Sequence, residues 1–215
     1  IYVTACALVV GVPIGILTAV FMAKYCPKGL YRILKPAINL LAGIPSVIYG
    51  FFALVVIVPF FNDIFGGTGG KSILTAGILL GIMILPTIIS MSEAAIRAVP
   101  ESYEEGALAL GATKERSIFK AVLPAAKSGL TASVILGIGR AIGETMAVVM
   151  IAGNQTAMPS SILKGVRTLT TNIVLEMGYA ADLHREALIA TGVVLFVFIL
   201  IINLLFSFFK RRSKI

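Results

Sequence analysis

Long runs of apolar residues alternate with shorter polar segments along the whole chain. Each run approaches or exceeds the roughly 20 residues that a helix needs to cross about 30 Å of hydrocarbon. Helices are expected because a segment in lipid must satisfy its own backbone hydrogen bonds. The pattern predicts five membrane-spanning helices, at Ile1–Ala23, Ala37–Phe60, Ile73–Met91, Gly129–Ile151 and Ala187–Phe209.

The composition supports a membrane protein and excludes two other classes. Of the 215 residues, 58% are hydrophobic and 13% are charged, whereas a soluble domain carries about 25% charged residues. The chain is also too apolar to be intrinsically disordered. We therefore predict an all-α fold, a polytopic membrane helical bundle in which residues 1–215 form a single transmembrane domain.

The basic residues are distributed unevenly among the segments between the predicted spans. Thirteen of the 18 Lys and Arg residues lie in segments 24–36, 92–128 and 210–215, and four lie in segments 61–72 and 152–186. Because cytoplasmic loops are enriched in Lys and Arg, the N-terminus is predicted outside and the C-terminus in the cytoplasm. Five spans that begin outside lead us to expect a sixth span upstream in the full protein.

The net charge of +8 therefore reflects membrane topology, and we expect contact with membrane lipid and no binding of nucleic acid. The external segment 153–185 is expected to include a short helix near Thr170–Met177. Its single histidine, His184, lies near two carboxylates that lack metal-ligand spacing, so no metal site is predicted.

Two ionisable residues, Arg140 and Glu144, lie inside the fourth predicted span. Ionisable groups at that depth are costly unless they are paired or hydrated. Their spacing places them on one helical face and permits a salt bridge. Two interpretations stay open: a neutralised pair that fixes helix packing, or a polar translocation path. The Arg guanidinium suits an anionic oxyacid, because its fork matches phosphate-type oxygens.

Proline interrupts the second predicted span at Pro45, which is followed by Ser46 and Tyr49. Proline removes a backbone donor and frees a carbonyl one turn earlier. The residues either belong to a bent helix beside a cavity or form a kink that neighbouring helices satisfy. Under the first interpretation, the translocation path is expected to include Arg140, Glu144, Pro45, Ser46 and Tyr49.

Segment 101–124 is predicted to form two short amphipathic helices in the cytoplasm. Acidic residues gather at its start, where the helix dipole favours anions. Gly111 is placed to end the first helix, and Thr113 to cap the second. The hairpin either lies on the lipid surface or docks onto another protein.

Within this segment, Glu105-Gly106-Ala107, Gly111 and Leu123-Pro124 resemble the signature of ABC-importer permeases. The chain departs from the signature at Gly106 and Ala121, where the family has Ala and Ile. The resemblance implies a type I permease fold and a coupling helix that inserts into a groove of a cytoplasmic ATPase. It implies coupling residues at Glu104, Glu105, Gly106, Ala107, Gly111, Leu123 and Pro124.

Three further stretches, residues 42–50, 139–148 and 166–172, resemble the permeases of phosphate-specific importers, and the C-type subunit more than the A-type. That resemblance implies ATP-driven phosphate import across a bacterial or archaeal plasma membrane. The implied partners are an A-type sister permease, two cytoplasmic ATPase subunits that bind the ATP, and an external phosphate-binding protein. The chain itself is then no enzyme and binds no cofactor.

Three alternatives remain at this point. The permease could carry another oxyanion or a small organic solute. The chain could be a secondary carrier that uses Arg140 and Glu144 as an ion relay, although such a carrier needs no ATPase-docking segment. It could also be a membrane scaffold that transports nothing.

Overall fold

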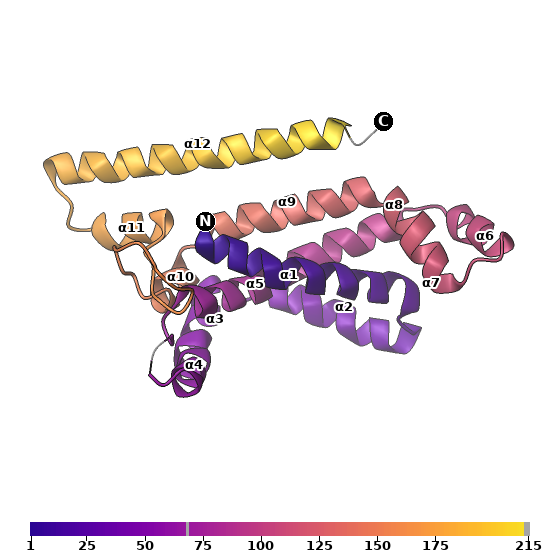
Figure 1. Cartoon of the computed structure of the whole chain (residues 1–215), viewed down its shortest axis with the longest axis horizontal. Coiled ribbons are helices and arrows are strands. Elements are labelled where there is room, and N and C mark those ends of the chain that lie inside the picture. Colours follow the sequence, from indigo (N-terminus) through magenta and orange to yellow (C-terminus); the bar gives the residue numbers. More distant parts are fainter. Residues whose placement is uncertain (68, 213–215) are drawn as a thin grey trace.

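The computed structural model describes residues 1–67 and 69–212 and is an elongated bundle of helices (Figure 1). The first half contains α1 (Tyr2–Val20), the π-helical turn η1 (Phe21–Tyr25), α2 (Lys28–Gly43), α3 (Ser46–Phe52), the π-helical turn η2 (Ala53–Ile57), α4 (Val58–Ile64) and α5 (Ile73–Arg97). The second half contains α6 (Ser102–Ala109), α7 (Lys114–Ser117), the π-helical turn η3 (Ile118–Val122), α8 (Leu123–Ala125), α9 (Lys127–Gly143), α10 (Met146–Ile151), α11 (Leu169–Glu176) and α12 (Asp182–Arg212).

Helix α5 is the centre of the bundle, and 15 of its 25 residues are buried. Ser72 caps its first turn by accepting a hydrogen bond from the Thr75 backbone N–H. Small residues let α1 lie directly against it, since a Cβ added at Gly77 would stand 2.5 Å from the Cys6 Cβ. Close backbone approach of this kind is how apolar helices gain packing energy in lipid.

Four helical segments are long and apolar enough to cross a membrane, and a bent pair makes a fifth if it counts as one span. Three of them confirm the first, third and fifth predicted spans, with shifted ends: Tyr2–Tyr25, Ile73–Arg97 and Asp182–Leu205. The basic tail predicted after the last span includes Lys214, which lies outside the described residues.

The other two predicted spans, Ala37–Phe60 and Gly129–Ile151, are wrong as continuous helices. The backbone is extended at Ile44 and Pro45, so α2 is separate and the candidate span is Ser46–Ile64. Helix α9 ends at Gly143, and its bent partner is the segment Lys114–Ala125, at an angle of 71°. In the sequence, the apolar run continues across each break, so hydropathy could not locate the breaks.

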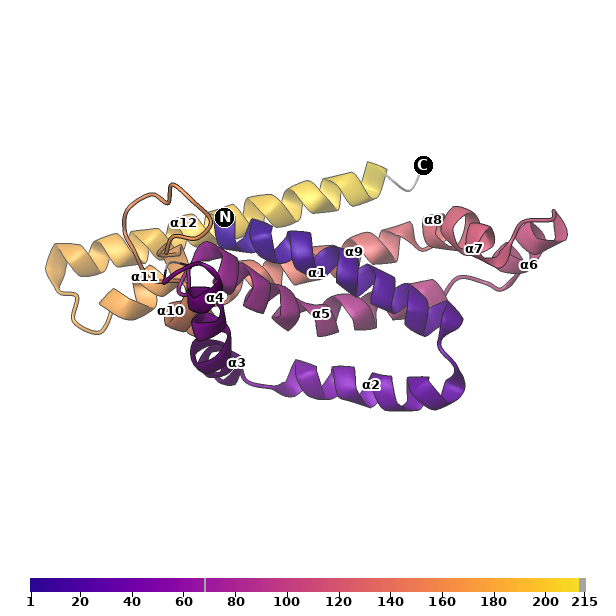
Figure 2. The same ribbon diagram turned by 60° about the horizontal axis from the view of Figure 1, so that its bottom comes forward.

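The two ends of the bundle differ in character (Figures 1 and 2). At one end, α6, α7 and α8 project as a bent hairpin, which we call the hairpin end. At the other end lie α3, α4, α10 and α11. Helix α12 runs along the side of the bundle, and its apolar window is only 6% buried. Large apolar surfaces are therefore left for lipid or for other subunits.

Candidate functional site

The break between α9 and α10 places Glu144 at the end of a helix. Its backbone is extended, with φ −67° and ψ 129°. One carboxylate oxygen, Oε1, accepts hydrogen bonds from the backbone N–H groups of Thr145 at 3.1 Å and Ala147 at 3.2 Å. Glu144 thus satisfies donors that open the short helix α10, where an anion is favoured.

Arg140 lies one turn earlier, on α9, and its guanidinium NH1 donates to the Thr87 Oγ1 of α5 at 3.2 Å. Thr87 follows Pro86, which lies inside α5. Among the described residues, no ion pair joins Arg140 to Glu144 or to any other carboxylate. The salt bridge that their spacing would permit on one helical face does not form here, because the helix ends between the two residues.

The break at Pro45 lies beside the break at Glu144. Tyr49 on α3 is buried, and its hydroxyl donates to the Leu41 carbonyl of α2 at 2.8 Å, which ties the two helices across the break. Helix α3 packs against α10 so closely that a Cβ added at Gly50 would stand 2.8 Å from the Ala147 Cα. Two interrupted helices therefore meet at this level of the bundle, with Ser46 as the first residue of α3.

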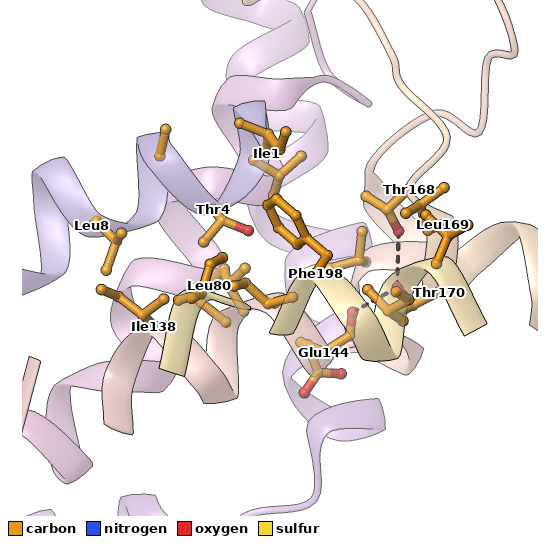
Figure 3. Close-up of a pocket in the computed structure, with 18 of the residues that line it drawn as sticks. Ile1, Thr4, Leu8, Leu80, Ile138, Glu144, Thr168, Leu169, Thr170 and Phe198 are labelled. Atoms are coloured by element: carbon orange, nitrogen blue, oxygen red, sulfur yellow. Dashed lines mark hydrogen bonds between the residues drawn. The ribbon is translucent and has the colours of Figure 1, made fainter. Parts of the chain in front are cut away.

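A cavity of about 630 Å³ lies between α1, α9 and α12 (Figure 3). Its walls are mostly apolar, and the polar residues that line it are Thr4, Glu144, Thr168 and Thr170. Thr170 Oγ1 donates to the Glu144 carbonyl at 3.2 Å, which joins α11 to the break. Of the five predicted path residues, the structure brings Glu144 to this cavity, whereas Arg140, Pro45, Ser46 and Tyr49 do not line it.

The hairpin predicted for residues 101–124 forms, with α6 and α7 joined by a turn at Gly111. Gly111 has φ +82°, a conformation that favours glycine, although a Cβ there would meet nothing within 4 Å. Thr113 caps α7 by accepting from the Arg116 N–H at 3.3 Å. The tip is apolar and exposed, and Leu110 is 91% exposed. Such a surface on a rigid turn is typical of a docking element.

The predicted coupling residues fall into two groups. Glu104 makes its contacts inside this chain: Lys24 Nζ lies 2.6 Å from its Oε2, and Ser117 Oγ donates to its backbone carbonyl at 3.1 Å. The others line the outer side or the base of the hairpin: Glu105, Gly106, Gly111 and Pro124 are exposed, and Ala107 and Leu123 are half-buried.

A buried ionic cluster near the hairpin end was not predicted. Glu93 of α5 is 2% exposed and receives hydrogen bonds from Tyr31, Lys35 and Arg97. Sequence reasoning assigned Glu93 and Arg97 to a cytoplasmic loop, because the third apolar run ends at Met91. The i,i+4 spacing of an acid and a base at the end of an apolar helix was the available signal.

The opposite end of the bundle holds a second ionic cluster, in the predicted external segment. Arg167 NH1 lies 2.6 Å from Glu176 Oε1, and Tyr179 donates to Glu176 Oε2 at 2.6 Å. The hydrogen bond from Tyr179 and the nearby Arg167 lower the pKa of Glu176 below its ordinary value. Helix α11 confirms the short helix expected here, and in the described part of the chain no group of side chains could hold a metal ion.

Comparison with known sequences places this architecture in context. Residues 11–215 match the family described as binding-protein-dependent transport system inner membrane component. The "Probable ABC transporter permease protein YqgH" of Bacillus subtilis is 40% identical over 99% of this chain and 70% of its own length. The "Phosphate transport system permease protein PstC" of Haemophilus influenzae is 37% identical, over 89% of this chain and 67% of its own length. PstC of Mesorhizobium japonicum is 36% identical, over 90% of this chain and 65% of its own length.

Solved structures agree with the predicted fold. An inward-facing MetNI methionine ABC transporter matches with a TM-score of 0.71 at 23% identity, covering 98% of this chain and 89% of that one. An amino acid ABC transporter matches with a TM-score of 0.66 at 20% identity, covering 98% and 88%. The all-α fold of a type I ABC importer permease is therefore confirmed, in a chain that spans about two thirds of its PstC relatives.

Proposed function

The chain belongs to the family of binding-protein-dependent transport system inner membrane components, and from this we propose that it is a permease subunit of an ATP-driven phosphate importer. The family makes it a multi-pass membrane transport component. The substrate is inferred from the PstC relatives, which are named for phosphate transport. ATP is hydrolysed on separate cytoplasmic subunits, and this chain is not itself an enzyme.

The observation that carries the proposal is the hairpin of α6 and α7. It projects beyond the bundle (Figure 2) and presents an apolar tip on a turn that only glycine adopts easily. In our proposal, a cytoplasmic ATPase grips residues 101–124, and closure of two such subunits rocks the helices between inward and outward states. The hairpin end and the C-terminus then lie in the cytoplasm of a bacterium or archaeon.

Arg140 is the proposed contact for phosphate. Its guanidinium has one neutral partner, Thr87, in the described structure, and no carboxylate neutralises it. A guanidinium in this state offers a transient attraction for an anion, and a permeating ion must not bind tightly. An A-type sister permease would supply the other half of the path, and an external phosphate-binding protein would deliver the ion near α11.

A second candidate is a permease for another oxyanion or a small solute. The name of the B. subtilis relative gives no substrate, and the structural neighbours are transporters of methionine and amino acids. A secondary carrier with an Arg140–Glu144 relay is disfavoured, since those side chains are not paired here.

The test is uptake of radiolabelled phosphate by the complete complex in proteoliposomes, with the binding protein outside the vesicles and ATP inside them. We expect uptake to require ATP and the binding protein, and to resist competition by sulfate and molybdate. Uptake that a proton gradient drives without ATP would contradict the proposal. Equal competition by the other oxyanions would support the second candidate instead.

A further inference from the structure

Among the residues that the structure describes, Glu93 is the one acidic or basic side chain that is buried, at 2% exposure. It lies on α5, one turn before the helix ends at Arg97. A buried carboxylate is costly unless several donors surround it. It lies near the hairpin end, which moves with the ATPase subunits in the proposed function.

Three donors surround the carboxylate, and two of them come from α2. Tyr31 donates to Glu93 Oε1 at 2.7 Å, and Lys35 Nζ donates to Oε2 at 2.7 Å. Arg97 Nε of α5 donates to Oε1 at 2.8 Å, and its guanidinium lies over the Tyr31 ring at 4.7 Å. The cluster therefore joins α2 to the end of α5 through charged hydrogen bonds.

Apart from this cluster, α2 packs against the bundle through Ile38 and the partly buried Tyr31 and Leu34. Ile38 is its one buried residue, and much of its apolar surface is exposed, including Ile33 at 69% and Leu40 at 73%. At its far end, the Leu41 carbonyl accepts from Tyr49. In the described structure, side-chain hydrogen bonds therefore fix the helix at two points, the Glu93 cluster near the hairpin end and Tyr49 just after the Pro45 break.

The segment that precedes α2 is tied to the hairpin. Lys24 pairs with Glu104 of α6 at 2.6 Å, and Lys114 of α7 lies over the Tyr25 ring at 5.3 Å. Arg97 joins the end of α5 to the same segment, because its NH2 donates to the Met22 carbonyl at 2.9 Å. A movement of the hairpin therefore acts directly on the residues that lead into α2.

We propose that Glu93 is a positioning residue for transport, which clamps α2 to α5 so that α2 follows the hairpin and carries its movement to the Pro45 break. This inference rests on the proposed function, since it assigns a task to a step of ATP-driven import. A merely structural ion pair would affect folding and assembly without changing how much substrate moves per ATP.

The test uses the complete complex with Glu93→Gln, which keeps the side chain's size and removes its charge. We expect ATPase activity to persist while phosphate imported per ATP falls about tenfold, the effect of losing one charge-assisted hydrogen bond. Ser92→Ala is the matched control. Ser92 is also buried on α5, but its hydroxyl bonds to Ser133 of α9 at 2.7 Å, and the described structure shows no hydrogen bond from it to α2.

Spin labels give a second readout that needs no transport. Labels at Ile33→Cys on α2 and Met91→Cys on α5, with Cys6 and Cys26 replaced by Ser, report the distance between the two helices. We expect a broader distance distribution in Glu93→Gln and an unchanged one in Ser92→Ala. Should Glu93→Gln fail to assemble, Tyr31→Phe is the alternative, because it removes only a hydroxyl. We expect it to lower the phosphate imported per ATP and to broaden the distance distribution, both by less than Glu93→Gln would.

An unchanged ratio of phosphate to ATP with an unchanged distance distribution would overturn the inference. So would a proportional loss of transport and ATPase activity, or the same loss of coupling in Ser92→Ala. If the wild-type complex imports no phosphate, the proposed substrate is wrong, and the spin-label distances still decide whether Glu93 clamps α2.

Discussion

Arg140 and Glu144 are four residues apart in the sequence and make no contact with each other's charge, because α9 ends between them. The guanidinium donates to Thr87 on α5, and the carboxylate accepts two backbone N–H groups at the start of α10. The two residues therefore have separable tasks. The Glu144 carboxylate holds the start of α10 in shape, and the Arg140 guanidinium is the contact proposed for phosphate.

Glu144→Ala is expected to destabilise the protein, since it leaves the N–H groups of Thr145 and Ala147 without their acceptor. Loss of a helix cap costs about 1 kcal/mol. Glu144→Gln keeps a side-chain oxygen at the same place and is expected to restore most of that stability. Thermal unfolding of the purified complex measures the stability of both variants. If both were destabilised equally relative to the wild type, the charge of Glu144 would matter and its role as a hydrogen-bond acceptor would not.

Arg140→Gln is expected to abolish phosphate uptake while the complex still assembles, because it removes the positive charge that we propose attracts the anion. Arg140→Lys keeps the charge but loses the bidentate fork and is expected to retain partial uptake. Thr87→Val, which removes the neutral partner of Arg140, serves as the control for packing. Wild-type uptake in Arg140→Gln would refute the role of Arg140 in the path.

Much of the fold follows from the sequence, because burying about 20 consecutive apolar residues dictates a helix. The hairpin was also predictable, since Gly111 and Thr113 are local signals whose geometry needs no tertiary context. The break at Glu144 was not, because Gly143-Glu144-Thr145 has no proline and its carboxylate becomes a cap only once the helix has ended. Glu93 was missed because two of its three donors, Tyr31 and Lys35, are about 60 residues away in sequence.

Gly111→Asp is expected to block association with the ATPase. Within the part of the chain that the structure describes, nothing lies within 4 Å of an added Cβ, so we expect the new side chain to face a docked partner. Positive φ adds a strain of about 1 kcal/mol for a residue with a Cβ. Co-purification with the ATPase measures the effect, and normal recovery of the ATPase would count against the docking role of the hairpin.

Gly106→Ala, which introduces the alanine of the family signature at a predicted coupling position, is the comparison variant on the same hairpin. Gly106 lies inside α6, and an added Cβ there also meets nothing within 4 Å. Replacing a helical glycine by alanine stabilises a helix by roughly 0.5–1 kcal/mol. We expect normal ATPase recovery and a slightly higher melting temperature.

Protonation of Glu176 is expected to loosen α11. Tyr179 and Arg167 lower the pKa of this carboxyl, so the folded state binds its proton less tightly than the unfolded state does. The resulting stabilisation is present above the ordinary carboxyl pKa and is lost as the pH falls through the lowered value. Hydrogen exchange of peptides from α11, corrected for the pH dependence of the intrinsic exchange rates, measures this loss of stabilisation. In Glu176→Gln, we expect weak protection of these peptides that no longer depends on pH in this range.

Gly50→Ala is expected to disrupt the contact between the two interrupted helices. The added Cβ would stand 2.8 Å from the Ala147 Cα and 2.9 Å from the Met150 Sδ, and the backbone atom cannot move without shifting α10. Forcing atoms into a packed contact costs about 1–3 kcal/mol, and here the shift would also displace the N–H groups that Glu144 caps. Gly43→Ala provides the comparison, because Gly43 ends α2 just before the Pro45 break and its added Cβ meets nothing within 4 Å. Thermal unfolding should separate the two variants clearly, and equal stability would mean that α3 and α10 do not pack as described.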